Sequence, residues 1–103
     1  MSTDIQIDEK IEEKLSRKLD EPGKFKVVLL NDDSTPMEWV IEVLVSIFKH
    51  SETQAKDITL QIHNEGSGIA GIYVYEIAEQ KAIEATNSSR DRGFPLQLRI
   101  DKE

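Results

Sequence analysis

The sequence of 103 residues contains no cysteine, three prolines, five glycines and one tryptophan. The absence of cysteine excludes disulfide bonds, thiol chemistry and thiolate metal ligands. No stretch approaches the roughly 18 apolar residues that a membrane-spanning helix requires, and no apolar signal segment follows Met1. We therefore expect one compact domain in a protein that stays in the cytoplasm.

Positive charge is also scarce, with 13 Lys and Arg against 20 Asp and Glu and a net charge of −7. An acidic surface repels nucleic acid and anionic membranes, so neither is an expected partner. The histidines, His50 and His63, do not have the spacing of a zinc motif. We expect no metal ion and no cofactor.

The first 23 residues differ from the remainder, because they are rich in charge and end at Pro22-Gly23. Four aliphatic residues recur there at intervals of four: Ile7, Ile11, Leu15 and Leu19. A helix would carry them as one narrow apolar stripe, but so short a helix is marginal in water. We predict a flexible N-terminal extension over residues 1–23 and a folded domain over residues 24–103.

Within this domain, alternating apolar residues predict a strand over residues 24–30. The segment TPME then has the pattern of a capping box, with Thr35 as the N-cap of a helix that ends near Lys49. Residues 51–65 are ambiguous. Ile58, Leu60 and Ile62 alternate as in a strand, whereas Ala55, Ile58, Thr59 and Ile62 would share one face of a helix. A strand over residues 69–74, a helix from 75 to about 88 and a strand over 96–100 follow.

The polar segment NDD after the first strand is open to three interpretations. Asn31, Asp32 and a neutral His63 would supply the acceptors that a primary ammonium group needs. Turn chemistry alone would select the same residues, and the local pattern by itself favours a turn. A small phosphoryl-transfer or metal-dependent enzyme would use Asp32 and Asp33. That alternative is weak, because Asn31 occupies the position where the phosphatase signature D-x-D-x-T needs a nucleophilic aspartate.

Four segments in order, KFKVVLLNDDSTPMEWVIEVL, HNEG, YEIAEQKA and FPLQL, resemble ClpS, the adaptor of the bacterial Clp protease. The resemblance covers residues 24–103 and implies an α+β fold. Three antiparallel strands pack against three helices in the order β-α-α-β-α-β, with residues 51–65 as a helix. It also implies an adaptor without catalytic residues. A monomer of this kind binds substrates whose first residue is Leu, Phe, Tyr or Trp, and delivers these N-degrons to a ClpA-type or ClpC-type unfoldase and its peptidase ClpP.

The resemblance also assigns roles to individual residues. Asn31, Asp32 and His63 would hold the α-amino group of the substrate. The pocket for the first side chain would be lined by Thr35, Met37, Val40, Thr59, Ile62 and Leu96, with Met37 crowding out β-branched residues. Thr59 departs from the methionine that is usual in the family, so the pocket is expected to be roomier or more polar.

Contact with the unfoldase would involve its N-terminal domain and three residues of the fourth segment: Glu76, Glu79 and Lys81. From the sequence alone, a solvated helix surface is the preferred explanation of these residues. The N-terminal extension would be engaged by the unfoldase during handover. A regulator of the Clp ATPase that carries no substrate is the remaining alternative.

Overall fold

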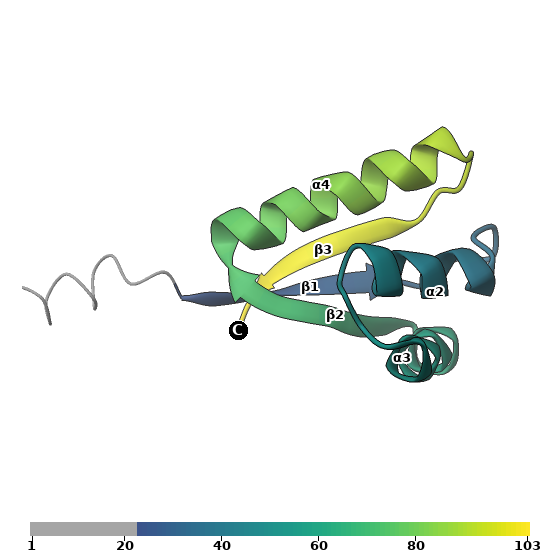
Figure 1. Ribbon diagram of the computed structural model, residues 1–103, viewed down its shortest axis with the longest axis horizontal. Coiled ribbons are helices and arrows are strands. Elements are labelled where there is room, and N and C mark those ends of the chain that lie inside the picture. The colour runs from purple at the N-terminus through teal and green to yellow at the C-terminus, as the bar shows by residue number, and fades with distance from the viewer. Residues whose placement is uncertain (1–22) are drawn as a thin grey trace, which may run out of the picture.

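The computed structural model describes residues 23–103, which fold in the order β-α-α-β-α-β (Figure 1). The elements are β1 (Lys24–Leu30), α2 (Met37–Ser46), α3 (Glu52–Glu65), β2 (Ser67–Val74), α4 (Tyr75–Asp91) and β3 (Gln97–Lys102). This order confirms the predicted α+β fold. The predicted flexible extension lies outside the described residues, apart from Gly23. Between residues 23 and 103, no helix is long and apolar enough to cross a membrane.

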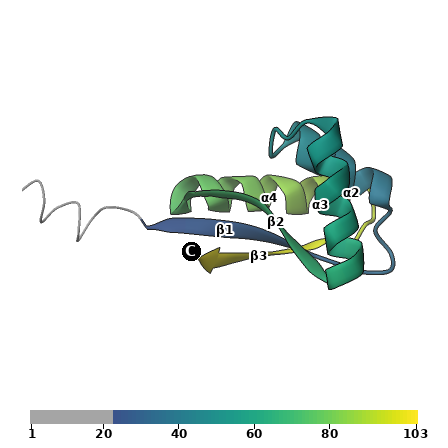
Figure 2. The same ribbon diagram turned by 90° about the horizontal axis from the view of Figure 1, so that it is seen from below.

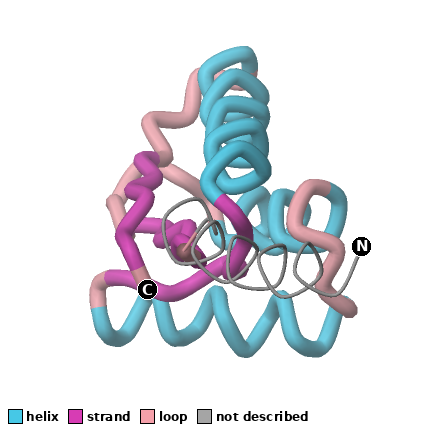
Figure 3. The backbone as a smooth tube through the Cα atoms, turned by 90° about the vertical axis from the view of Figure 1, so that its left-hand side faces the viewer, coloured by secondary structure: helices cyan, strands magenta, loops and turns pink. Residues whose placement is uncertain are grey.

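The three strands form one antiparallel sheet in the order β2-β1-β3. β1 lies in the centre, which explains why it carries the most apolar strand sequence and why Val27 and Leu29 are fully buried. α4 runs along one face of this sheet (Figure 2). α3 runs across the direction of α4 and packs against β2, as the end-on view shows (Figure 3). α2 lies between these two helices and completes the core.

A buried chain of hydrogen bonds joins α2 to α4 inside the core. The indole Nε1 of Trp39 donates to Ser89 Oγ over 2.8 Å, and Ser89 Oγ donates to the carbonyl of Ala85 over 2.7 Å. Trp39 and Ser89 are both buried, so each polar atom of this chain has a partner where water is excluded. The arrangement fixes the position of α2 relative to the sheet.

The predicted capping box at the start of α2 is wrong. Pro36 is the N-cap, and no side chain caps the helix. Thr35 precedes the N-cap, and its Oγ1 donates to Asp32 Oδ2 over 2.8 Å. The carbonyl of Pro36 still accepts the first helical bonds, from the N–H groups of Trp39 and Val40. α2 also ends at Ser46 rather than near Lys49, whose φ of 65° lies in the left-handed region.

Residues 51–65 contain the helix that the resemblance implies, so the strand-like alternation in this segment is misleading. Ser51 is its N-cap, and Ser51 Oγ accepts a hydrogen bond of 3.1 Å from Gln54 N. Ala55, Thr59 and Ile62 face the core, whereas Leu60 is 52 % exposed. α4 continues to Asp91, beyond the predicted end near residue 88, because Ser89 is held in the core by its bonds to Trp39 and Ala85.

Candidate functional site

The end of β1 and the end of α3 meet at one edge of the molecule. β1 and β2 pair so that Leu30 is opposite Ser67, and the backbone N–H of Asn31 donates to the carbonyl of Gly66 over 2.9 Å. Gly66 ends α3 with a φ of 93°, a conformation that glycine adopts without steric cost. Asn31 and His63, 32 positions apart in sequence, therefore flank the same site.

The loop after β1 is organised around the carboxylate of Asp32. Its Oδ1 accepts a 2.8 Å hydrogen bond from Ser34 N, and its Oδ2 accepts a 2.8 Å bond from Thr35 Oγ1. A carboxylate has about four acceptor positions, so each oxygen can accept another donor. Asp32 therefore fixes the loop and also presents negative charge and free acceptor capacity.

This loop, the start of α2 and the last turns of α3 enclose a cavity of about 210 Å³. Nine residues line it: Asn31, Asp32, Asp33, Thr35, Met37, Val40, Thr59, Ile62 and His63. Eight of them are predicted site residues, and Asp33 is the addition. Val40, Thr59 and Ile62 are buried, whereas Asn31, Asp33 and His63 are exposed. The cavity therefore combines buried, largely apolar walls with exposed hydrogen-bonding groups.

Leu96 is the one predicted pocket residue that does not line this cavity. Its side chain is 1 % exposed and belongs to the hydrophobic core. Its carbonyl accepts a 2.8 Å hydrogen bond from Arg90 Nη1, which ties the end of α4 to the start of β3. Leu96 therefore contributes to the hydrophobic core and not to the lining of the cavity.

The hydroxyl of Thr59 is already engaged within its own helix. Thr59 Oγ1 donates to the carbonyl of Ala55 over 2.8 Å, and the side chain is 4 % exposed. Such i−4 bonds are a common way for a helical threonine to satisfy its hydroxyl. Because the donor is used there, the main effect of Thr59 on the cavity is a short side chain. Of the two consequences expected from the sequence, the geometry favours the roomier pocket.

The three predicted unfoldase-docking residues do not form one free patch on α4. Glu76 and Glu79 are exposed, three positions apart and on the same side of the helix. Lys81 is half-buried, and its Nζ donates to the carbonyl of Ile47 over 2.8 Å while lying 5.5 Å from the ring centre of Tyr73. Lys81 therefore caps the C-terminal end of α2, where the carbonyl of Ile47 accepts its hydrogen bond. The local sequence pattern did not reveal this contact.

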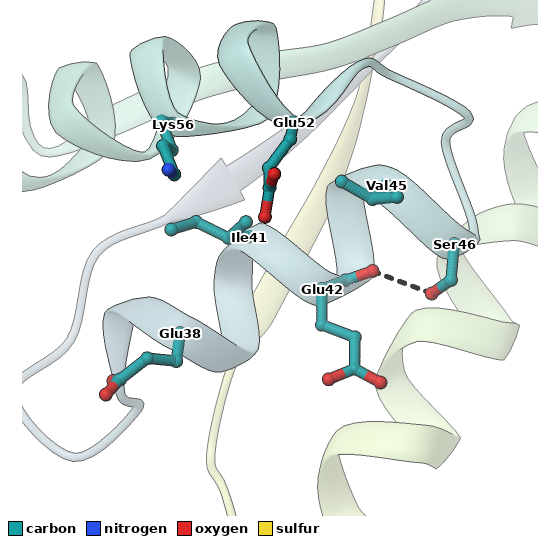
Figure 4. A pocket seen from close by; sticks show the side chains of 7 residues that line it. All are labelled: Glu38, Ile41, Glu42, Val45, Ser46, Glu52 and Lys56. Atoms are coloured by element: carbon teal, nitrogen blue, oxygen red, sulfur yellow. Dashed lines mark hydrogen bonds between the residues drawn. The ribbon is translucent and has the colours of Figure 1, made fainter.

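Further grooves lie outside this site. One of about 550 Å³ runs between α2 and α3, with Ile41 and Val45 along it. Glu52 and Lys56 reach toward it from α3, while Glu38 and Glu42 point away from α3 (Figure 4). We call this the α2–α3 groove. Another, of about 390 Å³, lies between α4 and β3 and is called the α4–β3 groove.

Metal-ligating side chains do not gather in the part of the chain that the structure describes. No group of three or more histidines or carboxylates is placed to hold an ion within residues 23–103. Asp32 and Asp33 are adjacent, but both oxygens of Asp32 already accept bonds from its own loop. The site is thus built from hydrogen-bond acceptors around a cavity.

Comparison with known proteins identifies the family. The family described as "ATP-dependent Clp protease adaptor protein ClpS" matches residues 20–99. Curated relatives named ATP-dependent Clp protease adapter protein ClpS include those of Treponema denticola, 41 % identical over 85 % of this chain and 87 % of the relative, and of Campylobacter jejuni, 45 % identical over 84 % and 90 %. The relative from Wolinella succinogenes is 43 % identical over 80 % of each chain.

A solved structure of Agrobacterium tumefaciens ClpS2 bound to L-phenylalaninamide is similar in both fold and sequence. It superimposes with a TM-score of 0.77 at 40 % identity, covering 80 % of this chain and 99 % of ClpS2. The fold, the order of the four sequence segments and these relatives lead to the same conclusion. The chain belongs to the ClpS family of adaptor proteins of the ATP-dependent Clp protease.

Proposed function

We propose that this adaptor binds the first residue of proteins that begin with Leu, Phe, Tyr or Trp. The binding site is the cavity enclosed by the loop after β1, the start of α2 and the last turns of α3. The carrying observation is that exposed acceptors and buried apolar walls line one cavity of about 210 Å³. L-Phenylalaninamide, the ligand of the related ClpS2, has both chemical features that such a cavity fits: a free α-amino group and an apolar side chain.

The α-amino group would be held by Asn31, Asp32 and His63. An ammonium group has three N–H donors and no acceptor. The amide oxygen of Asn31, the carboxylate of Asp32 and a ring nitrogen of neutral His63 supply three acceptors around one opening. Hydrogen bonds between an ammonium and a carboxylate are stronger than bonds between neutral groups. Asp32 is therefore the residue that most favours a charged amine over a blocked one.

The first side chain would enter the apolar part of the cavity. Burying a side chain as large as Leu or Phe contributes about 1.5–3 kcal/mol. Val40 and Ile62 form buried walls, and Met37, which is 38 % exposed, lines the cavity with them. A β-branched first residue carries its bulk next to the backbone, where Met37 would crowd it. The short side chain of Thr59 leaves room for aromatic rings.

Catalysis has no part in this proposal. The site offers acceptors that bind an amine, and Asn31 occupies the position where a phosphatase of the D-x-D-x-T type would need its nucleophile. A regulator without substrate binding would have no use for a cavity of this composition. Hydrolysis of the substrate would instead be carried out by the Clp protease that the adaptor serves.

Delivery would involve contacts away from the cavity. We propose that the exposed carboxylates of Glu76 and Glu79 contact the N-terminal domain of a ClpA-type or ClpC-type unfoldase, and that residues 1–23 are engaged during handover. The adaptor would act as a monomer in the cytoplasm. Deleting residues 1–22 should leave substrate binding unchanged while it slows degradation by the reconstituted protease.

A peptide panel that varies only the first residue tests the proposed specificity. Peptides beginning with Leu, Phe, Tyr or Trp should bind, and those beginning with Val, Ile or Asp should bind at least tenfold more weakly, a difference of about 1.4 kcal/mol. Fluorescence anisotropy with a labelled Leu peptide as the displaced ligand measures this series. Equal binding of the whole panel would contradict the proposal.

A further inference from the structure

The α2–α3 groove continues the cavity along the same two helices. On α2, Ile41 of the groove lies one turn after Met37 of the cavity. On α3, Lys56 of the groove lies three positions before Thr59 of the cavity. Residues three or four positions apart in a helix are neighbours on one face, so the cavity and the groove adjoin along both helices. The α4–β3 groove is lined by other elements and lacks this continuity.

A substrate whose first residue fills the cavity must direct its second residue out of it. The amine would be held beside His63, in the last turn of α3. The N–Cα–C angle of about 111° turns the carbonyl side of that residue away from the amine. The groove lies on the other side of Thr59, toward the first turns of α3, where Glu52 and Lys56 are found. A path along the groove therefore leads away from the amine acceptors and over the surface of the adaptor.

The groove has the length of a short extended peptide. From Met37 to Val45, α2 rises about 12 Å, and roughly four residues of extended chain at about 3.3 Å each span this distance. With the first residue in the cavity, positions 3–5 of the substrate would lie along the groove. The chain is already tethered at the cavity, so weak contacts in the groove still add to its affinity, because they form within one complex.

The groove offers apolar surface beside polar side chains. Ile41 is half-buried and Val45 is 36 % exposed, so apolar surface remains open to a side chain of the substrate. Glu52 and Lys56 reach toward the groove from α3 (Figure 4). A carboxylate accepts hydrogen bonds and an ammonium donates them, so the two side chains can bond the N–H and C=O groups of an extended backbone.

Charge narrows the kind of segment that fits. Glu38 and Glu42 lie along the α2 side of the groove and Glu52 along the α3 side, against one ammonium group, that of Lys56. Acidic side chains of a substrate would meet like charge there, which disfavours them. The occupant that fits is therefore an extended segment that carries an apolar side chain and no carboxylate.

We propose that the α2–α3 groove binds positions 3–5 of the substrate and takes one apolar side chain of this segment against Ile41 and Val45. The inference rests on the proposed binding of the first residue in the cavity. It adds a second determinant of recognition, because substrates with the same first residue then differ in affinity according to the residues that follow it. L-Phenylalaninamide, the ligand of the related ClpS2, ends before this segment and does not reach the groove.

A series of peptides that begin with Leu and continue with serine tests the groove contact. A second Leu is placed at position 3, 4 or 5 in turn, and at position 8 as a control beyond the groove. Because apolar burial is favourable, the best of the first three should bind about fivefold more tightly than the peptide without a second Leu, and position 8 should add nothing. Val45→Ser should abolish this gain and leave the Kd of L-phenylalaninamide unchanged. Leu60→Ser, at an exposed apolar residue of α3 outside the groove, should preserve the gain.

Methyl NMR signals of the full-length protein locate the contact. The best peptide should shift the signals of Ile41 and Val45, which L-phenylalaninamide should leave in place, and neither ligand should shift those of Ile83 and Ile100 in the α4–β3 groove. If the amide binds but no second Leu changes the affinity, or if the shifts fall in the α4–β3 groove, the inference is overturned and the proposed function stands. Shifts of Ile41 and Val45 that follow protein concentration without peptide would assign the groove to a second copy and also overturn it. If neither the amide nor any peptide binds, the proposed function fails, and this inference with it.

Discussion

Replacing Asp32 with asparagine separates the charge of this side chain from its role in the loop. In Asp32→Asn the remaining oxygen can still accept the bond from Ser34 N, which measures 2.8 Å in the structure. The new amide can donate to the hydroxyl oxygen of Thr35, which now donates to Asp32 Oδ2 over 2.8 Å. The loop should therefore keep its shape, while the site loses one negative charge.

The expected loss of affinity follows from the difference between charged and neutral hydrogen bonds. Bonds to charged groups contribute about 1.5–3 kcal/mol, against about 0.5–1.5 kcal/mol for neutral pairs. Asp32 is half-buried, so solvent screens part of this difference. We expect a loss of about 1.4 kcal/mol, which makes the Kd for a Leu-starting peptide about tenfold weaker.

Fluorescence anisotropy measures this Kd, and thermal unfolding shows whether the loop survives. Asp33→Asn is the matched control, because Asp33 lines the same cavity and removes the same charge. We expect its effect on affinity to be at most half as large in free energy. If Asp32→Asn binds as tightly as the native protein, or only as weakly as Asp33→Asn, the reasoning about the amino group is refuted.

Three further changes test the pocket and the core. Thr59→Met should weaken the binding of peptides that begin with Phe or Trp about fivefold more than the binding of peptides that begin with Leu. The reason is that added side-chain volume in a packed site costs about 1 kcal/mol or more. An equal effect on all three peptides in competition binding would contradict this prediction. Ser89→Ala leaves the buried indole N–H of Trp39 without an acceptor. Urea denaturation should therefore show a free energy of unfolding about 1–3 kcal/mol lower. If Ser89→Ala costs as much in a Trp39→Phe background, the lost indole hydrogen bond is not the cause. Burial raises the pKa of Tyr73 above its ordinary value of 10.0, so the folded protein keeps this proton at a pH where the unfolded chain loses it. Stability should therefore fall as the pH rises above about 10, and Tyr73→Phe should fall less; identical pH profiles would contradict it.

Much of the fold could be predicted because the patterns involved are local. The strand over residues 24–30 depends on the alternation of its own side chains. The helix over residues 51–65 could not be decided by periodicity, because Ile58, Leu60 and Ile62 fit either period. Only the order of the four sequence segments, through the resemblance to ClpS, pointed to the helix.

Contacts between distant residues account for what the sequence did not reveal. α4 continues to Asp91 because Ser89 bonds to Trp39, 50 positions earlier in sequence. Lys81 turns toward Ile47. None of these partners can be identified from periodicity or composition, since each depends on how helices pack in space.

The most direct test of the central claim is to block the α-amino group of the ligand. One peptide beginning with Leu is prepared with a free amine and again with that amine acetylated, and binding is measured by fluorescence anisotropy. Acetylation removes the positive charge and two of the three N–H donors, while the side chain is unchanged. The account predicts at least a hundredfold loss of affinity, or about 2.7 kcal/mol. Equal affinity of the two peptides would contradict it.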